Sequence, residues 1–250
     1  MLLRARALAC IRAEKLLFSG LSFASEPGYA MALTGPNGIG KSSLLRLIAG
    51  LLPVHAGTVE LVKTQGARVL AGTGCDMPLG QYCHYLGHRD ALKPSMSVIE
   101  TLDFWSAFLG PLPASDHGKT QSDISENAEK GAASPESPPL QPLSLGDTPP
   151  ATPVSADAAL ERVGLSHLAD LPCQLLSAGQ RRRLTLARLL VVARPLWLLD
   201  EPTTALDSAG QDILWHLCAS HLDNGGVVMV ATHAPLPVPN RIVALDRALS

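Results

Sequence analysis

The amino-acid sequence predicts an α/β fold in which a buried strand leads into a glycine-rich loop and then into a helix. The strand is expected at Ala30–Thr34, an almost wholly apolar run, and the helix at Ser43–Ala49. Between them, Gly35–Ser42 reads GPNGIGKS, which matches the phosphate-binding template G-x-x-x-x-G-K-[ST] at every defined position. A chain of 250 residues is long enough for one such domain with a substantial core.

The residue types in this loop point to a nucleotide with a bound metal ion. Glycines let consecutive backbone N–H groups face a polyphosphate, and the helix adds the positive end of its dipole. Lys41 supplies a cation for the β- and γ-phosphates, and the Ser42 hydroxyl is a hard oxygen ligand for Mg²⁺. The predicted nucleotide contacts are Gly35, Pro36, Asn37, Gly38, Ile39, Gly40, Lys41, Ser42 and Ser43.

Three further segments around the loop have clear periodicity. Residues Ala7–Phe23 alternate apolar and polar positions and predict a β pair, and His55–Leu61 predicts a turn followed by a strand. Ser97–Leu109 has apolar residues at helical spacing, with Ser97 as the N-cap and Glu100 at the capping-box position. The loop strand is therefore expected to follow a small β unit and to precede a helical one.

The composition changes abruptly at residues 111–155, which are rich in Pro, Ser, Ala, Asp and Glu. Aromatic and β-branched residues are nearly missing from this stretch, so it cannot bury enough apolar surface to offset the entropy of ordering. We predict a disordered insertion there. Ordered structure is expected to resume with a helix at Ala158–Val163.

An apolar strand, Trp197–Leu199, leads into two adjacent carboxylates, Asp200 and Glu201. A carboxylate at a strand end beside a phosphate loop can hold Mg²⁺, usually through water, and the next can orient or deprotonate an attacking water. Because successive strand residues face opposite sides, we expect different roles for the two. Another core strand is expected at Val227–Thr232.

A second loop precedes a basic helical run at Arg181–Leu190 and reads Leu-Ser-Ala-Gly-Gln over residues 176–180. Ser177 is a natural N-cap, and Gly179 allows a phosphate to approach the helix N-terminus closely. In the order of its motifs the chain resembles the ABC ATPase family, whose signature usually reads LSGGQ. Here Ala178 replaces the third residue, which adds one methyl group and leaves the Ser177 hydroxyl and the Gly179 N–H usable.

The resemblance covers residues 7–247 apart from the insertion. It implies a RecA-like P-loop NTPase core with a small antiparallel β subdomain and a helical subdomain, and it implies hydrolysis of ATP with Mg²⁺. Two copies of the chain would form an ATP-sandwich dimer, in which the phosphate loop of one copy meets Ser177, Gly179 and Gln180 of the other. Thr203–Asp207 resembles the segment that crosses the dimer interface, and His233 resembles the switch histidine that contacts the γ-phosphate.

Two positions depart from the family pattern. After the strand expected at His84–Gly87, where the family usually has glutamine, this chain has His88. Imidazole suits Mg²⁺ less well than an amide oxygen, so contact through water and contact with a partner protein are the alternatives to direct ligation. The family usually also carries an aromatic residue that stacks on adenine, and this chain has Arg12 near that position, whose guanidinium can stack instead.

Shorter segments resemble the ATP-binding subunits of haem exporters used in bacterial cytochrome c biogenesis; they are Leu8–Arg12, Leu16–Phe23, Tyr85–His88, the Ala178 variant and Pro195–Pro202. That resemblance implies an ATPase that drives haem export, or release of a haem chaperone, through separate multispanning membrane subunits. Two alternatives remain open. One is the ATPase of another small exporter, for a drug, lipid or polysaccharide, and the other is a soluble ABC ATPase without a transport role.

Net charge and hydrophobicity limit which partners and which cellular location the chain can have. The formal net charge is -2, which argues against a nucleic-acid partner held by a basic surface. The most apolar helix-like stretch is interrupted by Arg188, Arg194 and Pro195, so we expect no membrane span, and the N-terminus lacks the apolar core of a signal peptide. Five cysteines without metal spacing suit a reducing cytoplasm. We therefore expect a peripheral protein on the cytoplasmic face of the bacterial inner membrane.

Overall fold

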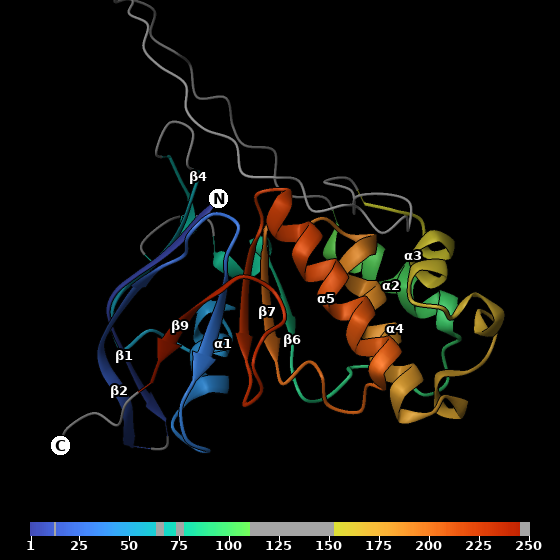
Figure 1. Ribbon diagram of the computed structural model, residues 1–250, viewed down its shortest axis with the longest axis horizontal. Coiled ribbons are helices and arrows are strands. Elements are labelled where there is room, and N and C mark those ends of the chain that lie inside the picture. The colour runs from blue at the N-terminus through green and yellow to red at the C-terminus, as the bar shows by residue number, and fades with distance from the viewer. Residues whose placement is uncertain (13, 64–67, 74–77, 111–152, 246–250) are drawn as a thin grey trace, which may run out of the picture. The chain divides into compact units, whose positions relative to one another are not determined.

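The computed structural model describes residues 1–12, 14–63, 68–73, 78–110 and 153–245. Within these ranges the strands form two sheets, a four-stranded one in the order β2-β1-β4-β5 and a five-stranded one in the order β6-β7-β8-β3-β9. Helices cover both faces of the five-stranded sheet (Figure 1). The predicted α/β fold is therefore confirmed.

The four-stranded sheet is antiparallel. Its strands are β1 (Leu2–Arg12), β2 (Lys15–Ala24), β4 (Ala56–Lys63) and β5 (Arg68–Gly72), and β1 pairs with both β2 and β4. The predicted β pair is thus present, and its two strands are longer than the alternation indicated. The sheet corresponds to the small antiparallel subdomain that the family resemblance implies.

The five-stranded sheet is parallel throughout. Its strands are β3 (Ala30–Thr34), β6 (Cys83–Leu86), β7 (Leu196–Asp200), β8 (Val227–Ala231) and β9 (Asn240–Ala244). Parallel strands covered on both faces have continuous apolar sequences, and every residue of β7 and β8 is buried. The loops that follow β3, β7 and β8 leave from one edge of the sheet, where ligands bind in folds of this kind.

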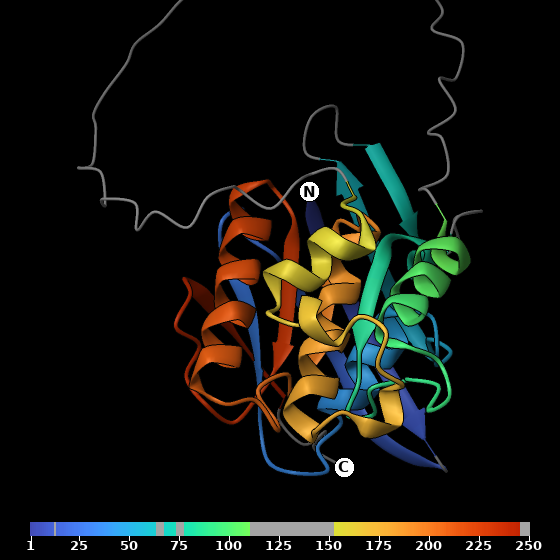
Figure 2. The same cartoon turned by 90° about the vertical axis from the view of Figure 1, so that its right-hand side faces the viewer.

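A separate hydrophobic core lies on each face of this sheet. Helix α1 (Lys41–Ile48) packs between the two sheets, and β7 contributes Leu196 and Leu198 to that core. On the other face, Trp197 and Leu199 of β7 pack in the core formed with the remaining helices (Figures 1 and 2). These helices are α2 (Val98–Leu109), α3 (Ala156–Arg162), α4 (Ala178–Val191) and α5 (Ser208–Asp223).

Local sequence explains where these helices begin. Ser97 and Glu100 form the predicted capping box of α2, and Ser177 forms another with Gln180 at the start of α4. Three short 3₁₀ turns lie at Leu79–Tyr82, Ser166–Leu168 and Cys173–Leu175.

The insertion predicted at residues 111–155 lies outside the described residues except for its last three positions. There, Ser155 is the N-cap of α3 and its side chain accepts a hydrogen bond from the Ala158 N–H. The helix predicted at Ala158–Val163 accordingly begins two residues earlier. Among the helices in the described ranges, none has both the length and the apolar character needed to cross a bilayer.

Candidate active site

The phosphate-binding loop joins β3 to α1, and its backbone requires glycine. Gly35 has φ 142° and Gly40 has φ 117°, a conformation that side chains with a Cβ atom rarely adopt. A Cβ atom at Gly35 would also lie 2.8 Å from the carbonyl oxygen of Leu245. Gly40 is the N-cap of α1, so the positive end of the helix dipole opens directly onto the loop.

The ammonium group of Lys41 is held by the loop itself. The side chain is largely buried, and Nζ donates to the carbonyl oxygens of Gly35 at 2.7 Å and Pro36 at 3.2 Å. The same Nζ atom lies 3.3 Å from Nε2 of His233. A phosphate entering the loop is a charged acceptor and competes well against these neutral carbonyls.

Ser42 and Asp200 meet at the end of β7. The Ser42 hydroxyl donates to Oδ1 of Asp200 at 2.9 Å, and this carboxylate is 1% exposed. The other carboxylate oxygen, Oδ2, accepts from the Tyr85 hydroxyl at 3.4 Å and lies 3.8 Å from Nε2 of His88. Nε of Arg46 in turn donates to the Tyr85 hydroxyl at 3.1 Å. The carboxylate is therefore held in one orientation.

No local pattern assigns Tyr85 or Arg46 to the site, and the structure adds both residues to it. Burial raises the pKa of the Tyr85 phenol, and the hydrogen bond to Arg46 lowers it in part. The same hydrogen bond raises the pKa of Arg46. The phenol thus keeps its proton at neutral pH and has it available for Asp200. The sequence feature that could have pointed to Tyr85 was a tyrosine, with its polar hydroxyl, inside the short strand before His88.

The donor chemistry of Ser42 and Asp200 fits a magnesium ion. Their oxygens are hard ligands 2.9 Å apart, and Mg²⁺ usually takes only one or two protein ligands and completes its shell with phosphate and water oxygens. No group of three or more His, Cys, Asp or Glu side chains in the described part of the chain is placed to hold a metal ion alone.

Glu201 lies just beyond β7 in a left-handed backbone conformation with φ 47°, which is uncommon for a residue with a Cβ atom. Its N–H donates to the Ala231 carbonyl at 2.9 Å, and Oε1 lies 3.6 Å from Nε2 of His233. Because the strand ends at Asp200, the alternation expected of strand residues does not apply to Glu201. Both carboxylates line the same cavity.

That cavity has a volume of about 570 Å³, within the range of small-molecule sites. It brings together predicted residues from five separate parts of the sequence; they are Arg12, Asn37, Gly38, Gly40, Lys41, Ser42, Ser43, His88, Asp200, Glu201 and His233. Leu17 and Thr204 also line it. Gly35, Pro36 and Ile39 shape the loop without being among the lining residues.

The signature residues lie outside this cavity. The Ser177 hydroxyl accepts from the Gln180 N–H at 3.2 Å, and the Gln180 side chain accepts from the Ser177 N–H at 2.8 Å. Ser177 and Ala178 are exposed. A Cβ atom at Gly179 would lie 3.1 Å from the Ala205 carbonyl oxygen, so glycine lets α4 approach the turn after β7.

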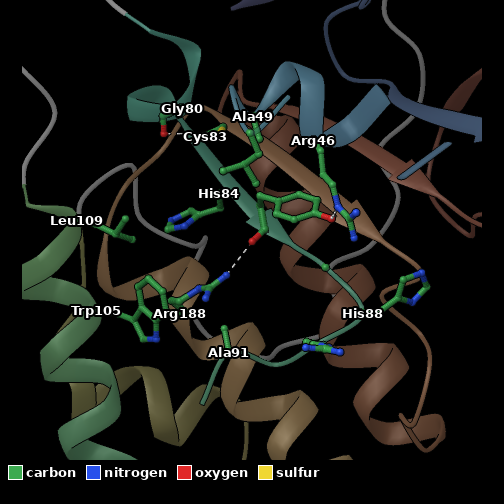
Figure 3. A pocket seen from close by; sticks show the side chains of 14 residues that line it. Arg46, Ala49, Gly80, Cys83, His84, His88, Ala91, Trp105, Leu109 and Arg188 are labelled. Atoms are coloured by element: carbon green, nitrogen blue, oxygen red, sulfur yellow. Dashed lines mark hydrogen bonds between the residues drawn. The ribbon is translucent and has the colours of Figure 1, made fainter. Parts of the chain in front are cut away.

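A second cavity of about 480 Å³ opens between α1, β6, α2 and α4 (Figure 3). Trp105 and Leu109 line its α2 side, and the Arg188 guanidinium lies 4.3 Å from the centre of the Trp105 ring. Burial, and then the charge of Arg182, lower the pKa of Arg188 to about 10. We call this second cavity the groove and the cavity of about 570 Å³ the nucleotide cavity. His88 lines both, so the loop after β6 separates the two.

Comparisons with known proteins agree with this geometry. The family model described as ABC transporter matches residues 18–204. The chain is 44% identical over 248 residues to the cytochrome c biogenesis ATP-binding export protein CcmA of Rhodopseudomonas palustris (strain BisB5), covering 99% of this chain and 100% of that one. It is 39% identical to the protein of the same description from Bartonella quintana (strain Toulouse), covering 99% and 96%.

Solved structures show the same fold. A putative ABC transporter ATP-binding protein from Pyrococcus furiosus superposes with a TM-score of 0.66 at 20% identity, covering 98% of both chains. The inward-facing conformation of a putative metal-chelate type ABC transporter superposes with a TM-score of 0.64 at 25% identity, covering 98% of this chain and 80% of that one. The chain therefore belongs to the ABC transporter family, as an ATP-hydrolysing member of the group of cytochrome c biogenesis ATP-binding export proteins.

Proposed function

We propose that this chain hydrolyses ATP in a cytochrome c biogenesis export complex, whose membrane subunits export haem or release a haem chaperone. One observation carries the proposal. The phosphate loop, Asp200, Glu201 and His233 line one cavity in a chain that matches the relatives named as cytochrome c biogenesis export proteins over nearly its whole length.

In the proposed reaction, ATP places its β- and γ-phosphates in the loop. Lys41 leaves the Gly35 and Pro36 carbonyls and donates to phosphate oxygens, where a close cation stabilises the charge that develops during transfer. Ser42 and Asp200 would hold a magnesium ion, which would neutralise phosphate charge. His88, whose Nε2 lies 3.8 Å from Oδ2 of Asp200, would contact that ion through a water molecule.

Glu201 orients and deprotonates the attacking water. Its carboxylate is partly exposed to the cavity and lies 3.6 Å from Nε2 of His233. His233 contacts the γ-phosphate and holds the carboxylate in the attacking direction. Burial explains why we assign different roles to the two carboxylates. Asp200 is almost inaccessible and accepts a hydrogen bond from Ser42, whereas Glu201 is partly exposed and can contact a water molecule.

A second copy of the chain completes each site. Ser177, Gly179 and Gln180 are outside the cavity of their own chain, and the exposed N-terminus of α4 suits the γ-phosphate bound by a partner copy. Thr203–Asp207 lies in the same dimer interface. Arg12 lines the cavity at its β1 side, where its guanidinium stacks on adenine.

The groove of Figure 3 is the face that we assign to a membrane subunit, which places the protein peripherally at the cytoplasmic side of the inner membrane. Two exposed aromatic side chains of α2 lie beside Trp105 of the groove, since Phe104 is 47% and Phe108 68% exposed and their ring centroids lie 5.5 Å and 5.7 Å from that of Trp105. Large apolar side chains left in water at one site mark interaction surfaces. Phe108→Asp should therefore abolish co-purification with the multispanning subunits and leave ATP binding intact.

The decisive experiment is made in cells. Replacing the chromosomal copy with Lys41→Ala or Glu201→Gln should stop maturation of c-type cytochromes and leave b-type haem proteins unaffected, because only the former need this export system. Haem staining of membrane fractions distinguishes the two. Normal c-type cytochromes in both strains would reject the cytochrome c assignment, while ATPase assays of the same variants would test the hydrolytic site separately.

A further inference from the structure

Arg182 is a buried charge that connects three segments around the site. It lies in the first turns of α4 and is 3% exposed. Its guanidinium donates to the carbonyl oxygens of Glu201 at 3.0 Å, Pro202 at 3.1 Å and Asp200 at 3.3 Å. It also donates to the Gly87 carbonyl at 2.9 Å and lies 3.4 Å from Oδ1 of Asp90.

Such a guanidinium fixes the positions of its acceptors. A buried charge is tolerated only when its hydrogen bonds are satisfied, and the planar fork of arginine demands acceptors in fixed directions. Asp90 is the one carboxylate among these acceptors, and the remaining four are backbone carbonyls. The turn after β7 is therefore held in the conformation in which its carbonyl oxygens accept hydrogen bonds from the guanidinium group.

The turn needs this support because Glu201 has an unfavourable backbone conformation. Its φ of 47° is left-handed, and non-glycine residues in that region persist only where the surroundings over-determine them. The Glu201 N–H donates to the Ala231 carbonyl, and the Glu201 carbonyl accepts from Arg182 and, at 3.2 Å, from the Thr204 N–H. Of these contacts, Arg182 is the one side chain, so it is the partner that a substitution can remove.

Side chains on one face of α4 link the turn at Glu201 to the groove of Figure 3. Arg182, Thr185 and Arg188 follow one another at helical spacing, and all three contact β6 or the segment after it. The Thr185 hydroxyl, which donates to the Arg181 carbonyl at 3.0 Å, lies 3.5 Å from the Asp90 carbonyl, and Arg188 donates to the Tyr85 carbonyl at 2.8 Å. Gly87 and His88 of that segment line the groove.

We propose that Arg182 is a positioning residue for hydrolysis, which holds the Glu201 turn in its active conformation and ties it to the loop at Gly87–Asp90. The inference rests on the proposed role of Glu201 as the group that orients water. Arg182 is not among the residues that line the nucleotide cavity, so it should affect turnover and not nucleotide affinity.

The test compares Arg182→Gln with Arg194→Gln in the full chain. Arg194 is a buried arginine that also donates to carbonyls, those of Leu109, Gly110 and Ala193, and none of these lines the nucleotide cavity. Arg182→Gln should lower kcat at least tenfold, with KM and the dissociation constant of a fluorescent ATP analogue within twofold of wild type. Arg194→Gln should lower Tm while keeping kcat within twofold.

Two further measurements separate positioning from folding. Hydrogen exchange at the amides of residues 201–204 should become faster in Arg182→Gln than in Arg194→Gln, a readout that does not need turnover. Arg182→Lys, which keeps the charge and reaches fewer carbonyls, should give an intermediate kcat. Loss of nucleotide binding together with turnover in both Arg182 variants would overturn the inference by showing a general structural role.

Wild-type kcat in Arg182→Gln, alongside an inactive Glu201→Gln, would also overturn the inference and leave the proposed function standing. An inactive wild-type chain, in isolation and with its membrane subunits, would overturn both.

Discussion

Nζ of Lys41 lies 3.3 Å from Nε2 of His233, although 192 positions separate the two residues in the chain. The same imidazole nitrogen lies 3.6 Å from Oε1 of Glu201. One nitrogen therefore faces a cation on one side and a carboxylate on the other, and it accepts from Lys41 in one tautomer or donates to Glu201 in the other. Movement of Lys41 to a phosphate would favour the second arrangement, in which His233 would support the carboxylate that we propose orients the attacking water.

Lys41→Ala removes the close cation from the phosphate loop. We expect the rate of ATP hydrolysis to fall by at least about 100-fold, in line with the loss of one preorganised electrostatic contact, and nucleotide binding to weaken as well. Steady-state ATPase assays and titration with a fluorescent ATP analogue measure the two effects. Turnover at the wild-type rate would reject the assignment of the phosphate loop.

Glu201→Gln keeps the shape of the side chain and removes its charge and basicity. ATP binding should persist, while hydrolysis should fall by about 10²–10⁴-fold, the usual contribution of a general base. Bound but unhydrolysed ATP should then keep two copies together, which size-exclusion chromatography with light scattering detects. A monomer at saturating ATP would argue against the two-chain site, whatever the rate.

Tyr85→Phe removes the hydroxyl that donates to Oδ2 of Asp200. The carboxylate becomes less constrained, so the Mg²⁺ concentration for half-maximal ATPase activity should rise several-fold. Spectroscopic titration with Mn²⁺ in the presence of nucleotide reports the same change without turnover. Tyr82→Phe is the matched control, because it removes the hydroxyl of a neighbouring buried tyrosine that is not among the hydrogen-bond partners of Asp200 in the described part of the chain. Identical metal dependence in the two variants would contradict the role of Tyr85.

Two histidines, the buried His84 and the partly buried His221, should make stability depend on pH. Burial lowers the pKa of His84 to about 3 and that of His221 to about 4, from 6.5. Both are neutral in the folded protein, so the unfolded chain binds more protons as the pH falls below 6.5. Each histidine should then lower the free energy of unfolding by about 1.4 kcal/mol per pH unit, until the folded-state pKa is reached.

Urea denaturation at pH 7.5, 6 and 5 measures that loss. His84→Gln keeps an N–H donor within reach of the Val192 carbonyl, which His84 Nε2 contacts at 2.7 Å. This variant should lose about half of the pH dependence. The same slope in variant and wild type would place the proton uptake elsewhere.

Motifs that depend on neighbouring residues were predictable from the sequence. The phosphate loop and its flanking strand and helix, the capping box at Ser97, the N-cap at Ser177, and the acidic end of β7 all appear where local patterns predicted them. Their physical basis is local, because glycine conformations, helix caps and apolar periodicity act over a few residues. The roles proposed for Lys41 and Glu201 rest on these motifs.

Only the tertiary structure brought in the residues that hold the site in place. Tyr85, Arg46 and Arg182 act through hydrogen bonds to residues between 18 and 115 positions away. No local pattern marks such partners, because the geometry of a guanidinium or phenol becomes specific only when separate strands and helices meet. Strand alternation fails at Glu201 for the same reason. β7 ends at Asp200, and the backbone of the turn that follows is hydrogen-bonded to Arg182 of α4 and Ala231 of β8, which lie 19 and 30 positions away, as well as to Thr204.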